Sequence, residues 1–165
     1  MSVLHARALR TMATLVAAAA APACRGPARA PAPARSYVFA FAGADDRKGG
    51  GSDFLAVIDA DPLSPTYGLV VASAPIHAVG TMPHHMELTM PGEGQWLFAN
   101  GFMSGRVFLF DLVNPLAPRL AATIDSVPGF VKPHSFWRLP DGNVLAALQY
   151  GDGRAPGNPG GLVLF

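Results

Sequence analysis

The chain has little charge and a single cysteine. Charged residues make up 14% of its 165 residues, and 12 Lys and Arg against 11 Asp and Glu give a formal net charge of +1. Because no run of basic residues occurs and none alternates with aromatic residues, the sequence argues against nucleic acid as a partner. One cysteine, Cys24, cannot form an internal disulfide or a Cys-x-x-Cys site. Sustained helical periodicity is also missing after the first 23 residues, which excludes a coiled coil or a long helical bundle.

Glycine and proline, in contrast, are abundant, with 18 Gly and 16 Pro. They separate short apolar runs that have the length of strands, and turn signals follow one another closely enough for a meander. The sequence therefore predicts an all-β fold. The runs are residues 37–41, 54–58, 68–72, 96–99, 107–110, 120–124, 144–148 and 162–165.

The first 23 residues have the pattern of a signal peptide. Arg7 and Arg10 precede an apolar stretch at 12–21, and small residues at 21 and 23 form a cleavage pattern. The stretch is too short for a membrane span, which needs about 20 apolar residues. The alternative is an alanine-rich helix of the folded domain. We therefore predict a signal peptide at 1–23 and export to the periplasm or the extracellular space.

The segment after the predicted cleavage site is rich in proline and alanine. Cys24 stands where a bacterial lipid-modified cysteine would stand, although Ala21 replaces the usual leucine three residues before it. Lipid anchoring at Cys24 is therefore an open alternative to free secretion. Residues 24–36 are predicted to be a linker, and the folded part is predicted to span 37–165.

The folded part repeats with a period of about fifty residues. An apolar run, an aspartate and two prolines three residues apart occur twice, with Asp59 and Asp111 52 residues apart. His85 and His134, 49 residues apart, each precede a proline by six residues. Such a period with several strands per unit is typical of a β-propeller.

A third copy begins at the end of the chain, where residues 161–165 match 106–110. Two blades and the start of a third cannot close a ring, so strand edges would stay unpaired. We therefore interpret 37–165 as the N-terminal blades of a larger propeller, truncated after Phe165.

The repeated histidines are candidate metal ligands. The innermost strands of neighbouring blades face one channel, and imidazole nitrogens bind Zn, Cu or Fe at about 2 Å. The repeat register selects His85 and His134, whereas a single-residue gap would select His84. Neighbouring strand residues face opposite sides, so one of His84 and His85 is expected to point inward. The alternative is that all are histidines bonded to backbone, the role expected for His77.

Other polar residues have structural interpretations. Asp59 and Asp111 precede turns and are expected to bond to the backbone there. The glycine-rich segment 151–161 fits no phosphate-binding motif and is predicted to be a connecting loop. Glu87 is a candidate partner or acid/base for the histidines.

The motifs together resemble the selenium-binding protein family, whose members include methanethiol oxidase. The segment 53–67 is similar to the family's D-Y-L-A-x-x-D-x-D-P-x-S-P-x-Y. His84 and His85 fall at its His-His pair, and 104–120 is similar to S-x-R-I-Y-V-x-D…P-x-A-P-x-L. His134 and the glycines up to 161 match H…G-x-V…L-G-D…G-x-G-G.

The resemblance implies a seven-bladed propeller and oxidation of methanethiol with O2 and water to formaldehyde, hydrogen sulfide and hydrogen peroxide. It implies copper held by His85 and His134, with His84 as alternative or additional ligand. Thiol-bearing members have a cysteine where this chain is apolar at 39–42, so selenium carriage through that cysteine is not expected. Some members also have a second histidine where this chain has Trp137. The alternative function is a non-catalytic propeller that binds selenium species, thiols or a protein.

Overall fold

The computed structural model describes residues 36–45, 51–88, 95–153 and 159–165. The predicted signal peptide and all but the last residue of the predicted linker lie outside these residues. Every regular element within them is a β-strand, which confirms the all-β prediction. Among them, no helix long and apolar enough to cross a membrane occurs. The strands are β1 Tyr37–Ala42, β2 Phe54–Asp59, β3 Val70–Pro75, β4 Pro83–Met86, β5 Trp96–Gly101, β6 Arg106–Asp111, β7 Arg119–Ile124, β8 Phe130–Arg138, β9 Val144–Gly151 and β10 Gly161–Leu164.

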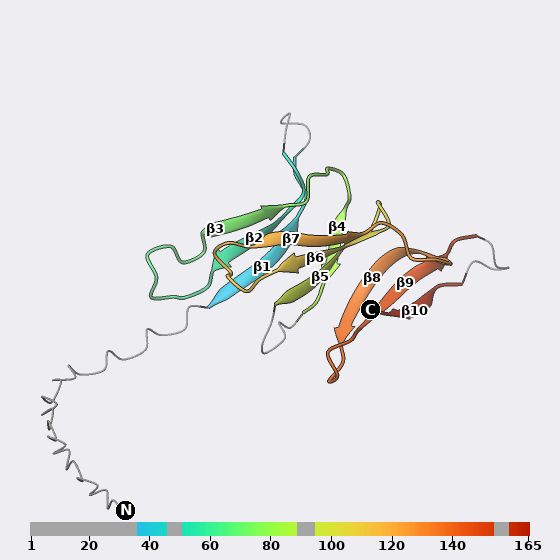
Figure 1. Cartoon of the computed structure of the whole chain (residues 1–165). Coiled ribbons are helices and arrows are strands. Elements are labelled where there is room, and N and C mark those ends of the chain that lie inside the picture. The colour runs from blue at the N-terminus through green and yellow to red at the C-terminus, as the bar shows by residue number, and fades with distance from the viewer. Residues whose placement is uncertain (1–35, 46–50, 89–94, 154–158) are drawn as a thin grey trace, which may run out of the picture. The chain divides into compact units, whose positions relative to one another are not determined.

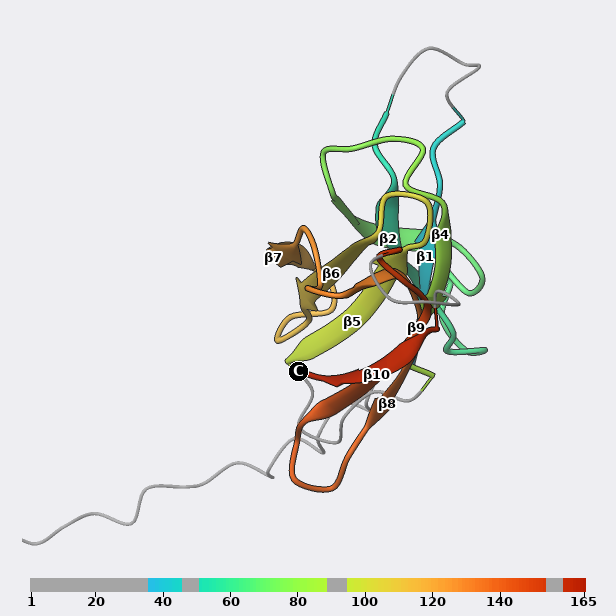
Figure 2. The same cartoon turned by 90° about the vertical axis from the view of Figure 1, so that its right-hand side faces the viewer.

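The described strands form three antiparallel sheets, each a meander. Their orders are β1-β2-β3, β4-β5-β6-β7 and β10-β9-β8. The four-stranded sheet contacts both others, because β4 lies near β1 and β8, and β7 lies near β3 (Figures 1 and 2). Strands distant in sequence, β4 and β8, are thereby neighbours.

The strand registers show the predicted repeat in three dimensions. Tyr37 pairs with Asp59 in the first sheet, and Trp96 pairs with Asp111 in the second. The strands β1 and β2 are therefore equivalent to β5 and β6. In the third sheet, β10 pairs with β9 as β6 pairs with β5, so that Gly161 corresponds to Arg106. The match of 161–165 with 106–110 is confirmed.

The core lies between the sheets and is built by the apolar runs. One buried cluster joins the first two sheets and a second joins the last two. Phe108 and Phe110 are fully buried, and the ring of Phe41 from the first sheet meets each of them edge-on at 5.6 Å between centroids. Truncating such a phenylalanine to alanine costs about 3–5 kcal/mol. Apolar packing therefore holds adjacent sheets face to face.

The aspartates that end β2 and β6 organise the turns that follow. Asp59 Oδ1 accepts from the backbone N–H of Asp61 at 3.0 Å, and Asp111 Oδ1 accepts from that of Val113 at 3.0 Å. Asp111 also accepts from the Arg119 side chain, and these bonds to Val113 and Arg119 hold its pKa below the ordinary value. The predicted bonding to turn backbone is confirmed.

Two strands lie outside the predicted apolar runs. β4 and β8 contain proline, histidine and, in β8, lysine, so they have no continuous apolar stretch. β3 begins at Val70 and not at Gly68, because Gly68 has a φ of +77° and belongs to the preceding turn. The apolar runs therefore located eight of the ten described strands and missed the two that carry the histidines.

Candidate metal centre

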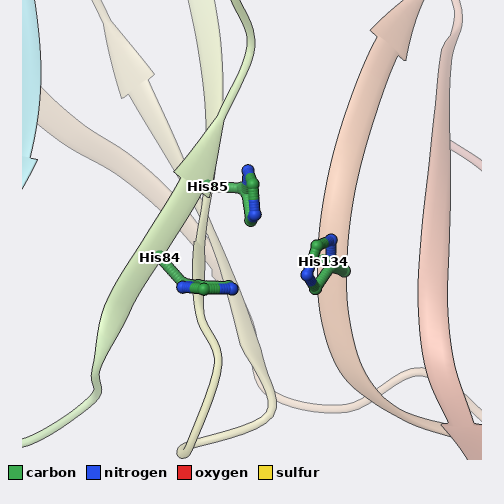
Figure 3. Close-up of side chains that lie close together, drawn as sticks. All are labelled: His84, His85 and His134. Atoms are coloured by element: carbon green, nitrogen blue, oxygen red, sulfur yellow. The ribbon is translucent and has the colours of Figure 1, made fainter.

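Three histidine side chains converge between the second and third sheets. His84 and His85 project from β4 toward His134 on β8 (Figure 3). The ring centroids lie 4.2 Å apart for His85 and His134, 4.4 Å for His84 and His85, and 4.9 Å for His84 and His134. One nitrogen from each ring lies within 4.8 Å of the other two. The structure thus brings together all three predicted site residues.

A β-bulge places two consecutive histidines of β4 on this site. Pro83 pairs with Gly101 and Met86 pairs with Ala99, so the two histidines between them lie opposite a single residue of β5, Asn100. A bulge of two residues against one breaks the alternation of side chains along the strand. The expectation that only one of His84 and His85 can point inward is therefore wrong.

The same bulge recurs in β8 and settles which histidines are equivalent. Pro133 pairs with Leu148 and Phe136 with Ala146, so His134 and the residue after it lie opposite one residue of β9. In both strands a residue of positive φ precedes the proline, with +57° at Met82 and +58° at Lys132. His84, directly after the proline, therefore corresponds to His134. The predicted register, which aligned His85 with His134, is off by one residue.

Asp53 fixes the chain at the entry to β4. Its Oδ2 accepts from the backbone N–H of Thr81 at 2.8 Å and from the Thr81 hydroxyl at 2.6 Å, and its Oδ1 accepts from the N–H of Ala44 at 2.9 Å. Burial raises the pKa of Asp53, but these hydrogen bonds outweigh burial and lower it overall. This carboxylate thus anchors the segment that leads into the histidine strand.

Asn100, fully buried beneath the cluster, was not identified from the sequence as a site residue. Its Oδ1 accepts from the His85 N–H at 2.8 Å, and its Nδ2 donates to the carbonyls of Pro133 at 2.5 Å and His134 at 2.7 Å. The signal that could have found it is an amide in an otherwise apolar strand. Asn100 connects the two strands that carry the histidines.

The histidines have different electrostatic surroundings. Desolvation lowers the pKa of His85, and charge repulsion from His134 and His84 lowers it further, so the neutral, metal-binding form is favoured. His134 Nδ1 lies 2.9 Å from the Ser135 hydroxyl. That hydrogen bond leaves Nε2 of His134 free as a ligand and orients its ring, as outer partners of metal-binding histidines do.

The donor set fits a transition-metal ion. Neutral imidazoles suit copper, zinc, iron and nickel, with bonds of about 2 Å. Two nitrogens on one ion are then at most about 4 Å apart. The three histidine nitrogens, all within 4.8 Å of one another, already lie close to that range. The three histidines can therefore share one ion.

Glu87 and His77, two further residues considered from the sequence, do not belong to the histidine cluster. The Glu87 carboxylate accepts from Arg138 Nε at 2.9 Å and Nη2 at 2.8 Å and from the Phe98 N–H at 3.0 Å, so it is committed to the contact between sheets. None of these bonds involves a histidine, so the structure gives no support to a role of Glu87 as their partner. His77 is exposed in a loop and is not one of the three clustered histidines.

An aromatic ring and a cation border the cluster. The Phe102 ring lies 5.2 Å from the His84 ring and 6.1 Å from the His134 ring. On that ring stacks the Lys132 ammonium, 5.4 Å from its centroid, and Lys132 also donates to the Met103 carbonyl at 3.2 Å. A small ligand at the histidines would thus meet an apolar ring and a nearby positive charge.

No profile of a known protein family matches the chain. Individual proteins do match it, and they are named either methanethiol oxidase or selenium-binding protein. A methanethiol oxidase from Hyphomicrobium sp is 34% identical over 101 residues, which cover 59% of this chain and 22% of that protein. Selenium-binding protein 1 from Arabidopsis thaliana is 31% identical over 121 residues, covering 64% of this chain and 25% of that protein. These relatives confirm the resemblance predicted from the motifs.

A solved structure of similar fold is also named a selenium-binding protein. It is a hypothetical selenium-binding protein from Sulfolobus tokodaii, with a TM-score of 0.61 and 22% identity over 79% of this chain and 31% of that one. The likeness confirms the fold class, with the three sheets as propeller blades. The chain spans about a quarter of the length of the curated relatives it matches.

Proposed function

Starting from this resemblance to selenium-binding proteins and methanethiol oxidases, we propose that the chain contributes a copper site to an oxidase of small thiols. The reaction would convert methanethiol, O2 and water into formaldehyde, hydrogen sulfide and hydrogen peroxide. The observation that carries the proposal is the convergence of His84, His85 and His134, with a nitrogen of each within 4.8 Å of the others. Copper is the metal we propose, because imidazole ligands suit it.

The residues of this chain would hold the ion and shape its surroundings. His84 and His85 offer two imidazoles from one bulged strand, and His134 offers Nε2, since its Nδ1 bonds to Ser135. When bound, copper would withdraw electron density from a coordinated thiolate sulfur and serve as the redox centre toward O2. The Phe102 ring gives an apolar surface for a methyl group, and Lys132 favours the thiolate over the thiol.

The test measures copper content and thiol oxidation on the full-length protein. We expect about one copper per chain, and O2 uptake with release of peroxide and sulfide that depends on methanethiol. His84→Ala, His85→Ala and His134→Ala should each lower both. The matched control is His77→Asn, which changes a histidine outside the cluster and keeps a residue that tolerates the φ of +59° found there. Unchanged copper content in all three alanine variants would overturn the ligand assignment.

A second function is favoured by the name of the Arabidopsis relatives, selenium-binding protein. The site would then bind a thiol or a selenium species without turnover. The same experiment separates the two functions, because a binder retains thiol or selenite and consumes no O2. Copper bound at the histidines without peroxide or sulfide release would favour this second function.

We also propose that the chain is exported through its N-terminal segment and acts in the periplasm or outside the cell. Support comes from the arginines and apolar stretch of residues 1–23 and from the small residues before Cys24. Mass spectrometry of the mature N-terminus tests this proposal. A new terminus at Cys24 carrying lipid mass would show anchoring, a new terminus without it would show secretion, and an intact Met1 would overturn export.

A further inference from the structure

One buried amide connects the two strands of the histidine cluster. Asn100 is fully buried, and its side-chain amide makes three hydrogen bonds to backbone groups, one as acceptor and two as donor. Its Oδ1 faces an N–H and its Nδ2 faces two carbonyls, so only one orientation of the amide satisfies every bond. The bonded groups belong to His85, Pro133 and His134. Asn100 therefore contacts the backbone on both sides of the site.

The internal repeat shows that the sheet itself does not require this amide. Asn100 pairs with Val107, the second residue of β6. The equivalent pairs are Phe41 with Leu55 in the first sheet and Ala147 with Leu162 in the third. The same position thus holds an aromatic residue and a small apolar residue elsewhere. The amide is specific to the place where two histidine strands meet.

The bulge geometry explains what the amide does there. His84 and His85 lie opposite Asn100 alone, so the backbone of the bulge lacks regular ladder partners at that point. The Asn100 side chain supplies the missing acceptor to His85 and, with its two donors, holds the start of the β8 bulge beside it. A buried polar group that is fully bonded fixes a unique arrangement of its partners.

We propose that Asn100 is the positioning residue of this metal centre, setting the spacing between the histidines of β4 and that of β8. The proposal rests on the proposed function in taking the three histidines as metal ligands. It assigns Asn100 no contact with the ion or the substrate. Its effect is to hold His85 and His134 at the 4.2 Å ring separation before any metal binds.

The first test needs no metal and uses the full-length protein with ¹³C-labelled histidine. In the wild type we expect nuclear Overhauser effects both within β4, between His84 and His85, and across the strands, between His85 and His134. Asn100→Leu keeps the shape without hydrogen bonds, and Asn100→Asp keeps the acceptor for His85 but removes the donors. Both variants should retain the signal within β4 and lose the one across the strands. Retention of both signals would overturn the proposal.

The second test measures copper. Changes to outer partners of metal ligands cost about 10–100-fold in affinity, and we expect a loss in that range for both Asn100 variants, with one fewer nitrogen ligand in the Cu(II) electron paramagnetic resonance spectrum. Glu87→Gln is the matched control, because it perturbs another polar link between the same sheets, one that runs to Arg138 and not to a histidine. An equal affinity loss in Glu87→Gln would overturn positioning, since general destabilisation would then explain it.

A measurement on the wild type keeps the proposal testable if a variant does not fold. Both Asn100 Nδ2 protons should exchange slowly with solvent, because each is bonded to a carbonyl and the Asn100 side chain is fully buried. Rapid exchange of either proton would overturn the proposal. A wild type that binds no copper would sink the proposed function alone, since the ring contacts and the exchange rates are measured without metal.

Discussion

The strands β4 and β8 share one local pattern and then differ, and the difference shows how the site is assembled. In each, a residue of positive φ and a proline precede a two-residue bulge whose first residue is a histidine. The next residue is a second histidine, His85, in β4 and a serine, Ser135, in β8. One strand thus supplies two imidazoles, and the other supplies one imidazole and a hydroxyl that orients it.

The comparison teaches that the repeat gives both strands the same backbone, while single residues give one of them a different function. Because both strands contain the bulge, the bulge is a feature of the blade fold and not of the metal site. The residues that differ are His85 against Ser135 and Asn100 against Ala147. Of these, His85 and Asn100 lie where β4 meets β8. The ends of the strands differ as well, with exposed Leu88 after β4 in the place of Arg138 on β8.

The largest expected effect comes from making the end of β8 like that of β4 with Arg138→Leu. This change leaves the Glu87 carboxylate, 2% exposed, without its ionic partner. Removing one partner of a buried ion pair costs about 3–5 kcal/mol. Urea unfolding should show this loss.

The matched control is Arg106→Leu, whose pair with Asp125 is exposed. Exposed ion pairs contribute about 0–1 kcal/mol to stability, and we expect the free energy of unfolding to fall by no more than that amount. Equal losses in the two variants would show that the Glu87–Arg138 pair does not hold the sheets together.

The next effect tests the unequal supply of ligands. His134→Ala removes the only imidazole that β8 brings to the cluster, so the remaining two come from adjacent residues and no longer span the two sheets. We expect copper affinity to fall by more than about 100-fold, beyond the usual effect of outer partners. His84→Ala keeps one imidazole on each strand and should cost less. Isothermal titration with copper measures both, and a larger loss for His84→Ala would contradict the comparison.

A smaller effect is expected from the hydroxyl of β8. Ser135→Ala removes the bond to His134 Nδ1 and with it the orientation of that ring. Copper affinity should fall by about 10-fold, the lower end for an outer partner. The control is Ser73→Ala on the exposed face of β3, which should leave affinity unchanged. No change in Ser135→Ala would show that the ring is oriented by other contacts.

The smallest effect concerns pH in the metal-free protein. The pKa of His85 is lowered in the folded state by desolvation and by His134 and His84, so the unfolded chain binds the proton more readily. This contribution to stability is present above the ordinary pKa of about 6.5 and is lost as pH falls through the folded value. Urea midpoints between pH 7.5 and 5 should decline less steeply in His85→Gln than in the wild type. If the urea midpoints of His85→Gln and the wild type declined equally with pH, the lowered pKa of His85 would not affect stability.

Apolar periodicity was sufficient to place the strands that fill the core. β2, β6 and β10 carry the repeated apolar runs, and their registers confirm that the three strands are equivalent. The motif residues also predicted the family resemblance. β4 and β8 were missed because their composition reflects the site and not the core, with proline and histidine where a central strand would have apolar residues.

By itself, the sequence determined that this chain is an all-β repeat with histidines spaced by one blade, because strands, turns and repeat period are encoded in neighbouring residues. Only the tertiary structure decided that His84 corresponds to His134, that His85 joins them, and that Asn100 and the Glu87–Arg138 pair connect their strands. The physical reason is that a bulge and a buried hydrogen bond depend on partners up to about fifty residues away. Such contacts leave no periodic pattern in the chain.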